Sequence, residues 1–209
     1  MSARDDILGA IRAGKPAMNA PAPAVPSYDD GYPQDREHLT ALFAERLTTM
    51  GGIWQAPTDG QNLDDALQEA LADKLGKPFE DAVIASNVSE VAGNRGINEN
   101  DDPTTLHDVD IAVLRATFGV AETGSVAFTE KELTVNAVAY LAQHLVVLLD
   151  PAEIVTNLHR AYQRDDFAGA RYTVFHTGPS ATADIEGVLV RGAQGVRSLT
   201  VIPAPATPA

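Results

Sequence analysis

The chain has 209 residues, 44% of them apolar and 21% charged, a balance typical of a single globular domain with a packed core. Its 29 acidic and 15 basic residues give a formal charge of −14, which argues against a nucleic-acid partner because phosphate binding needs an electropositive face. The chain contains no cysteine, so disulfides, thiolate nucleophiles and cysteine-ligated zinc or iron–sulfur clusters are excluded within it.

The N-terminal segment predicts a helix followed by a linker. Ile7, Leu8 and Ile11 lie on one stripe of a helix within residues 1–14, which we expect to dock on another surface. Residues 15–35 hold five of the thirteen prolines and predict an extended linker. Acidic residues near the start argue against a secretory signal, and no apolar run approaches the roughly 18 residues of a membrane span. We therefore expect a cytoplasmic protein without a membrane span.

Two amphipathic helices are predicted next. Apolar residues recur at helical spacing through residues 36–50, and Gly51 supplies a stop signal. The same pattern recurs in residues 63–71, with Gly76 after it.

Short apolar runs follow, rich in β-branched and aromatic residues and bounded by turn residues. Such runs are typical of strands buried on both faces, as in a parallel sheet covered by helices. We therefore predict a layered α/β fold for residues 36–203, with roughly six or seven strands in a mostly parallel sheet, and a short tail at 204–209. The expected strands are residues 81–86, 109–121, 125–130, 145–150, 172–176 and 198–203.

The stretch FHTGPSATADIEGVLVRGAQG, residues 175–195, predicts a turn from a strand into a helix. From Ser180 onward the apolar residues fall at helical spacing, and Gly178 and Pro179 suit a turn at a helix start. Free N–H groups at a helix N-terminus bind anions, so this turn is a candidate anion site. A well-capped core helix without a ligand is the alternative.

The stretch AETG, residues 121–124, lies between two strand-like runs, where Gly124 permits a sharp bend. Glu122 is the carboxylate at this bend, and it can serve as a general base or as a nucleophile toward an acyl group. A hairpin turn with a solvated Glu122 is the alternative.

Two further features carry weaker signals. Residues 98–105 cluster acidic side chains but match no cation-loop spacing, so we expect a solvated loop rather than a metal site. His144, just before an apolar run, either lines a site or is a hydrogen-bonded structural histidine, and the same two alternatives apply to His107 and His176.

The motifs AETGSVAF and GPSATADIEGVLVRGAQG together resemble the lactate-utilization protein C family, and QHLVVLLDPAEIV resembles that family's middle strand and following helix. The resemblance spans residues 36–203. It implies the three-layer α/β/α, Rossmann-like fold shared with ribose-5-phosphate isomerase, glucosamine-6-phosphate deaminase and CoA transferases. By analogy with the deaminases and CoA transferases, Glu122 and Gly124 are expected at the ligand site. The chain departs from the family pattern at Gln194, where a histidine is usual, and at Ala142, where a proline is usual.

The resemblance and the two loops together give a set of candidate site residues. Glu122 is the candidate catalytic residue. The candidate ligand-binding residues are Thr123, Gly124, Ser125, His144, Gly178, Pro179, Ser180, Thr182, Asp184, Gly192 and Gly195.

Three functions are compatible with these features. The resemblance implies a component of an L-lactate oxidation system that acts with iron–sulfur partner proteins and carries no cofactor of its own. The second is a self-sufficient enzyme that binds an acyl-CoA or a sugar phosphate, or another small anion, at the two loops. The third is a non-catalytic interaction or regulatory module.

Overall fold

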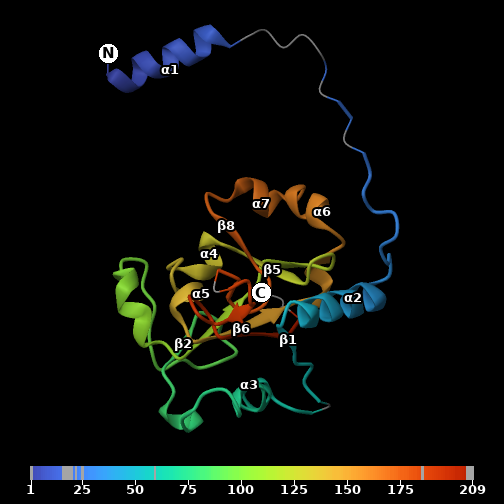
Figure 1. The fold of residues 1–209 in the computed structure, drawn as a ribbon, viewed down its shortest axis with the longest axis vertical. Coiled ribbons are helices and arrows are strands. Elements are labelled where there is room, and N and C mark those ends of the chain that lie inside the picture. The colour runs from blue at the N-terminus through green and yellow to red at the C-terminus, as the bar shows by residue number, and fades with distance from the viewer. Residues whose placement is uncertain are drawn as a thin grey trace.

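A five-stranded, fully parallel sheet forms the centre of the fold, in the order β1-β11-β6-β3-β2 (Figure 1). The computed structural model describes residues 2–15, 21, 23–24, 26–58, 60–184 and 186–205. The predicted α/β class with a mostly parallel sheet is confirmed. The strands are β1 (Ile53–Trp54), β2 (Ile84–Ser86), β3 (Ile111–Arg115), β6 (His144–Leu149) and β11 (Ser198–Pro203).

Side chains alternate between the two faces of this sheet, as the pleat of a β-strand requires. In β3, Ile111 and Val113 join the cluster on the face covered by α3 (Leu63–Leu71), whereas Ala112 and Leu114 join the larger cluster on the opposite face. Because both faces are buried, the strands carry the continuous apolar runs seen in the sequence.

The opposite face is covered by more than helices, which differs from the three-layer prediction. A second, four-stranded sheet packs there in the order β7-β4-β5-β8, with α2 beside it, while α6 and α7 border its far side. The run at 109–121, predicted as one strand, is divided between the two sheets because the chain leaves β3 at Ala116. The remaining elements of this half are β4 (Phe118–Val120), β5 (Ser125–Thr129), α4 (Glu130–Leu133), α5 (Val138–Leu141), β7 (Ile154–Val155), α6 (Leu158–Tyr162), α7 (Asp165–Gly169) and β8 (Thr173–His176).

The helix α2 (Arg36–Thr49) connects the two sheets. Asp35 caps its N-terminus by accepting a hydrogen bond from the His38 amide, and Phe43 and Leu47 are fully buried against the sheets. Gly51, at φ +88°, ends the helix as predicted. Within the described residues, short 3₁₀ turns lie at Phe79–Asp81, Pro103–Asp108 and Pro151–Glu153.

The N-terminal helix α1 spans Ala3–Gly14, and none of its residues is buried. Ile7 and Ile11 are 61% and 54% exposed, and Figure 1 shows α1 apart from the α/β body. Within the predicted linker, residues 16–20, 22 and 25 lie outside the described residues.

The last part of that linker, residues 28–32, packs on the body, and we call it the strap. Tyr28 stacks on His159 with ring centroids 3.8 Å apart, and Asp29 forms an ion pair with Arg160. The Asn157 side-chain amide donates to the Tyr28 carbonyl at 3.0 Å. The strap therefore fixes the chain along the start of α6.

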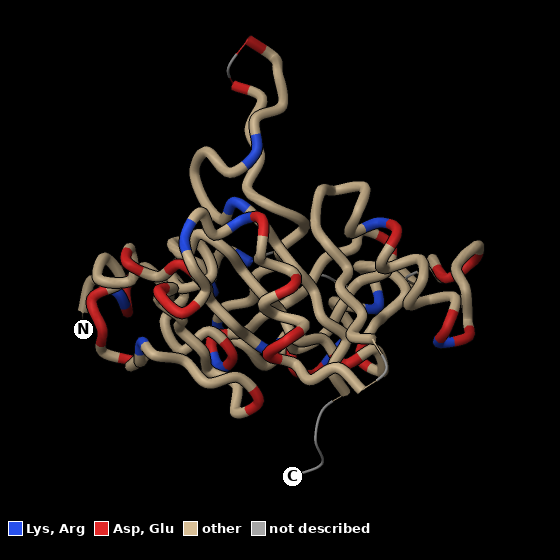
Figure 2. Tube along the Cα trace, turned by 90° about the horizontal axis from the view of Figure 1, so that it is seen from below, with Lys and Arg blue, Asp and Glu red and all other residues tan. Residues whose placement is uncertain are grey.

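Acidic positions are spread across the trace rather than gathered in one region (Figure 2). Among the described residues, no helix is long and apolar enough to cross a membrane.

Candidate functional site

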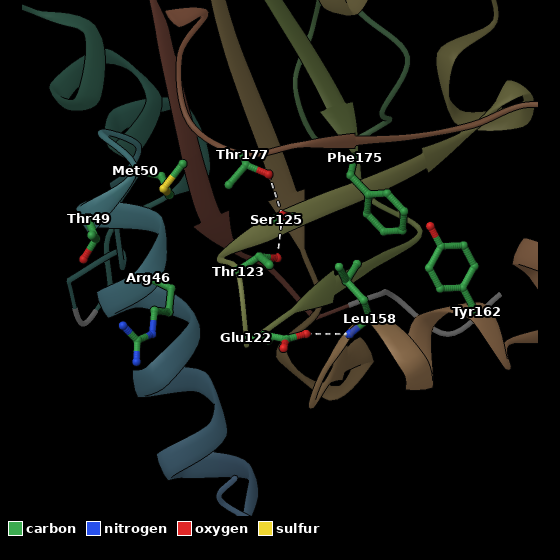
Figure 3. Close-up of a pocket in the computed structure, with 10 residues that line it drawn as sticks. All are labelled: Arg46, Thr49, Met50, Glu122, Thr123, Ser125, Leu158, Tyr162, Phe175 and Thr177. Atoms are coloured by element: carbon green, nitrogen blue, oxygen red, sulfur yellow. Dashed lines mark hydrogen bonds between the residues drawn. The ribbon is translucent and has the colours of Figure 1, made fainter. Parts of the chain in front are cut away.

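A cavity of about 570 Å³ opens between α2, the β4–β5 turn, β8 and the start of α6 (Figure 3). Its position brings together segments far apart in the sequence. We call it the Glu122 pocket. Its lining residues are Arg46, Thr49, Met50, Glu122, Thr123, Ser125, Leu158, Tyr162, Phe175 and Thr177.

Glu122 lies in the predicted hairpin turn between β4 and β5, and both of its carboxylate oxygens are already hydrogen-bonded. Oε1 accepts from the Tyr32 hydroxyl of the strap at 2.9 Å, and Oε2 accepts from the Leu158 amide at the start of α6 at 3.0 Å. The hydrogen bond to Glu122 and partial burial raise the pKa of Tyr32, so the phenol stays protonated and donates. Glu122 is thus a fixed acceptor at the pocket wall rather than a solvated turn residue.

Three hydroxyls form a row across the pocket. The Ser125 Oγ lies 2.6 Å from the Thr123 Oγ1 and 2.5 Å from the Thr177 Oγ1, because β5 and β8 pair antiparallel at this point. Two hydrogen bonds use two of the three hydroxyl hydrogens, so one O–H remains to donate to a ligand.

Arg46 supplies the positive charge of the pocket. Its side chain is 48% exposed, and its nearest ion-pair partner, Glu45, lies at 4.0 Å, the limit for such a pair. Opposite it, Leu158, Tyr162 and Phe175 form an apolar wall (Figure 3). The pocket therefore combines a weakly paired cation, a hydroxyl donor and apolar surface.

Gly124 faces α2 rather than the pocket. It adopts φ +68°, and a Cβ added to it would come within 2.6 Å of the Leu47 Cα. Its role in the structure is to let the β4–β5 turn approach the helix closely.

The predicted helix after Ser180 is wrong. Ala181–Thr182 form β9, which pairs antiparallel with β10 (Val190–Arg191) across a turn in which Glu186 and Gly187 have positive φ. Val188 and Leu189, which fall at that helical spacing, are 61% and 59% exposed, so neither is buried. The helix N-terminus predicted as an anion site is therefore not present; Ile185 lies outside the described residues.

The second set of predicted ligand residues divides between a cavity and the surface. Four of them line a separate cavity of about 320 Å³ beside β8: Gly178, Pro179, Ser180 and Gly195. Thr182, Asp184 and Gly192 line neither cavity. The Thr182 hydroxyl donates to the Asp184 carboxylate on the hairpin, and the Gly192 amide donates to the Ser180 carbonyl.

His144 lies in β6 and lines neither cavity. Its Nδ1 is 2.9 Å from the Ser198 Oγ, and burial lowers the pKa of its imidazole. His144 therefore has the environment of the hydrogen-bonded structural histidine that the sequence allowed as an alternative. The acidic residues of 98–105 likewise bond locally, Asp101 to the Asn98 amide and Asp102 to the Thr104 amide. No cluster of three or more potential metal-ligating side chains occurs in the described part of the chain.

Sequence reasoning missed two contributors, Arg46 and Tyr32. Arg46 lies on the polar side of an ordinary amphipathic helix, and Tyr32 ends a proline-rich segment, so neither carries a local signal. The sequence leaves His176 open between a site residue and a structural histidine, and the strand alternation of Phe175, His176 and Thr177 is the clue to its burial.

Comparisons with known proteins agree with this architecture. A DUF162 family protein from Deinococcus radiodurans, known from a crystal structure, shares 14% identity, with 82% of this chain and 99% of that chain covered and a TM-score of 0.58. That likeness shows the fold. None of the curated proteins matches the chain.

The family model described as the LUD domain matches residues 97–202, just over half of the chain. The matched segment includes Glu122, the hydroxyl row and the loop at 177–195, whereas Arg46 and the strap precede it. The chain belongs to the LUD domain family, which gives it, at the level of the family, a role in lactate utilization.

Proposed function

We propose that the chain is a ligand-binding component of a lactate-oxidation system that acts with iron–sulfur partner proteins. Oxidation of lactate to pyruvate releases two electrons and two protons, and a chain without cysteine offers no thiolate ligands for a cluster that would carry the electrons. The partners therefore supply the electron carriers, and this chain supplies the Glu122 pocket. The helix at residues 1–14 is the proposed docking element.

The observation that carries the ligand-binding role is that Arg46 and the hydroxyl row line the same pocket. A guanidinium binds carboxylates and phosphates in a fixed geometry, and the free hydroxyl hydrogen of the row provides a second donor. The ligand is accordingly an organic anion.

The size of the pocket narrows the ligand further. A volume of about 570 Å³ is in the range that holds cofactor-sized or drug-sized molecules, and it exceeds what a three-carbon acid fills. With Leu158 and Phe175 in the wall, we propose an anion that carries an additional apolar portion rather than lactate alone.

Thermal denaturation with added ligand tests this proposal. The probes are CoA, nucleotides, sugar phosphates, lactate and pyruvate, and a hundredfold excess of a true ligand over its dissociation constant stabilises the fold by about 2.7 kcal/mol. We expect one of the larger anions to raise the Tm of the wild-type protein. Arg46→Gln should abolish this shift, because it removes the cation.

Arg12→Gln is the matched control, since it removes the same charge from α1, where no residue is buried. It should retain the shift. Equal ligand-induced rises in Tm in both variants would show that Arg46 does not bind the ligand. No rise in Tm of the wild-type protein with any probe would contradict the pocket's role as an anion site.

A self-sufficient enzyme with Glu122 as base or nucleophile is the second candidate. Its support is the location of this carboxylate at the pocket wall. Each carboxylate oxygen already accepts one hydrogen bond, and release of the Tyr32 hydroxyl would open Oε1 further to a substrate. Turnover by the isolated chain that is lost in Glu122→Gln and increased in Tyr32→Phe would favour this candidate over the first.

A further inference from the structure

The cavity of about 320 Å³ beside β8 adjoins the Glu122 pocket but differs from it in chemistry. Phe175 and Thr177 line both cavities. The remaining wall comes from α5, the loop after β8 and the loop before β11. Its other lining residues are Ala139, Tyr140, His176, Gly178, Pro179, Ser180, Ala181, Gln194, Gly195 and Val196.

His176 is the distinctive group in this wall. Its side chain is only 8% exposed, and its Nε2 has no hydrogen-bond partner within the described residues. The imidazole packs against the rings of Phe128 and Tyr140, at centroid distances of 5.7 and 5.1 Å. A buried nitrogen without a partner is costly, and because His176 is one of the residues that line the cavity, a ligand bound there is the candidate partner.

The cavity is uncharged at neutral pH. Its lining contains no Lys, Arg, Asp or Glu, and burial lowers the pKa of His176 to about 4. A neutral imidazole offers one donor and one acceptor, and the Ser180 hydroxyl and the Gln194 amide each offer both kinds of group. With no positive charge to offset the loss of hydration, an anion is disfavoured here.

We propose that this cavity is a second binding compartment that takes an uncharged amide or hydroxyl group of a ligand, with His176 as its principal hydrogen-bond partner. An amide matches the imidazole because it too presents a donor and an acceptor. The compartment is independent of the anion site at Arg46.

The first test follows the histidine ring nitrogens of the full chain by NMR after labelling with ¹⁵N-histidine. The probes are lactamide and lactate, which have the same size but differ in charge. At pH 7 we expect lactamide to shift the His176 ring signals saturably, and lactate to leave them unchanged. The exposed His107 is the internal control and should not respond. An unchanged His176 signal with lactamide, or an equal response to lactate, would overturn the proposal.

Variants separate this compartment from a structural role and from the Glu122 pocket. His176→Phe keeps a ring of similar size but cannot hydrogen-bond, so the variant should bind lactamide more weakly. Because the variant lacks the His176 signal, binding is followed by the transfer of magnetisation from the protein to lactamide, which should fall at least tenfold. Its Tm without ligand should equal or exceed that of the wild type, because an unpartnered nitrogen is removed. A markedly lowered Tm would identify a structural imidazole and contradict the proposal.

Two further variants complete the design. Gln194→Leu changes an exposed loop residue, and it should weaken lactamide binding without loss of stability. Arg46→Gln should leave the His176 response to lactamide intact, which would hold even if the Glu122 pocket proved not to bind anions. Loss of the response in Arg46→Gln would show that the two cavities are one site and would refute an independent compartment.

Discussion

The buried His176 imidazole links the stability of the fold to pH. Burial lowers its pKa in the folded protein to about 4, against an ordinary value near 6.5 in the unfolded chain. Between these values the unfolded state binds a proton that the folded state does not. The stabilisation is therefore complete above pH 6.5 and is lost as the pH falls toward 4, at no more than about 1.4 kcal/mol per pH unit.

Urea denaturation of the wild type and of His176→Phe between pH 4 and 7.5 measures this effect. The carboxylates titrate in both proteins, so the difference between the two curves isolates the imidazole. We expect the variant to lose less free energy of unfolding than the wild type as the pH falls. Parallel curves would show that the pKa of His176 is not lowered in the folded protein.

The packing of the β4–β5 turn against α2 depends on Gly124. An added Cβ would strike the backbone of Leu47, and the residue's φ of +68° is strained for any side chain. Gly124→Ala should therefore destabilise the protein by more than the roughly 1 kcal/mol that a positive φ alone costs. The displaced turn should also lower the affinity of the Glu122 pocket for any ligand.

Gly76→Ala is the matched control for this prediction. Gly76 has φ +67°, and nothing lies within 4 Å of an added Cβ, so the variant carries the backbone strain without the steric clash. Denaturant unfolding of both variants gives the two free energies. Equal losses would show that α2 moves away freely and that the close approach is unimportant.

The strands were the most predictable elements, because burial on both faces leaves continuous apolar runs such as residues 145–150. The division of 109–121 between two sheets was not predictable, since the apolar character continues through the break. The hairpin at 181–191 was read as a helix because apolar spacing alone cannot show that Val188 and Leu189 stay exposed.

The site was only partly predictable for a related reason. Glu122, Thr123 and Ser125 lie in one short stretch with a turn signal, and the structure places them in one pocket. Arg46 lines the same pocket and Tyr32 hydrogen-bonds to its Glu122, from positions about 75 to 90 residues earlier in the chain. Contacts of that kind are set by tertiary packing, which no local pattern encodes.

At the scale of the whole molecule, α1 is separable from the body. Because no residue of α1 is buried, removal of residues 1–14 should leave the Tm unchanged. On the proposed docking role, the same deletion should abolish recovery of iron and acid-labile sulfide with the tagged chain from lactate-grown cells. A lowered Tm would contradict the separability of α1, and undiminished recovery would contradict its docking role.

The strands that end each sheet are short. β1 and β7 have two residues each, β2 has three and β8 has four, whereas β6 and β11, inside the central sheet, have six. Exposed strand edges are templates for aggregation, and a short edge presents few unpaired amides and carbonyls to another molecule. Together with the mutual repulsion of chains that each carry a formal charge of −14, this arrangement protects the protein from amyloid-like association at high concentration.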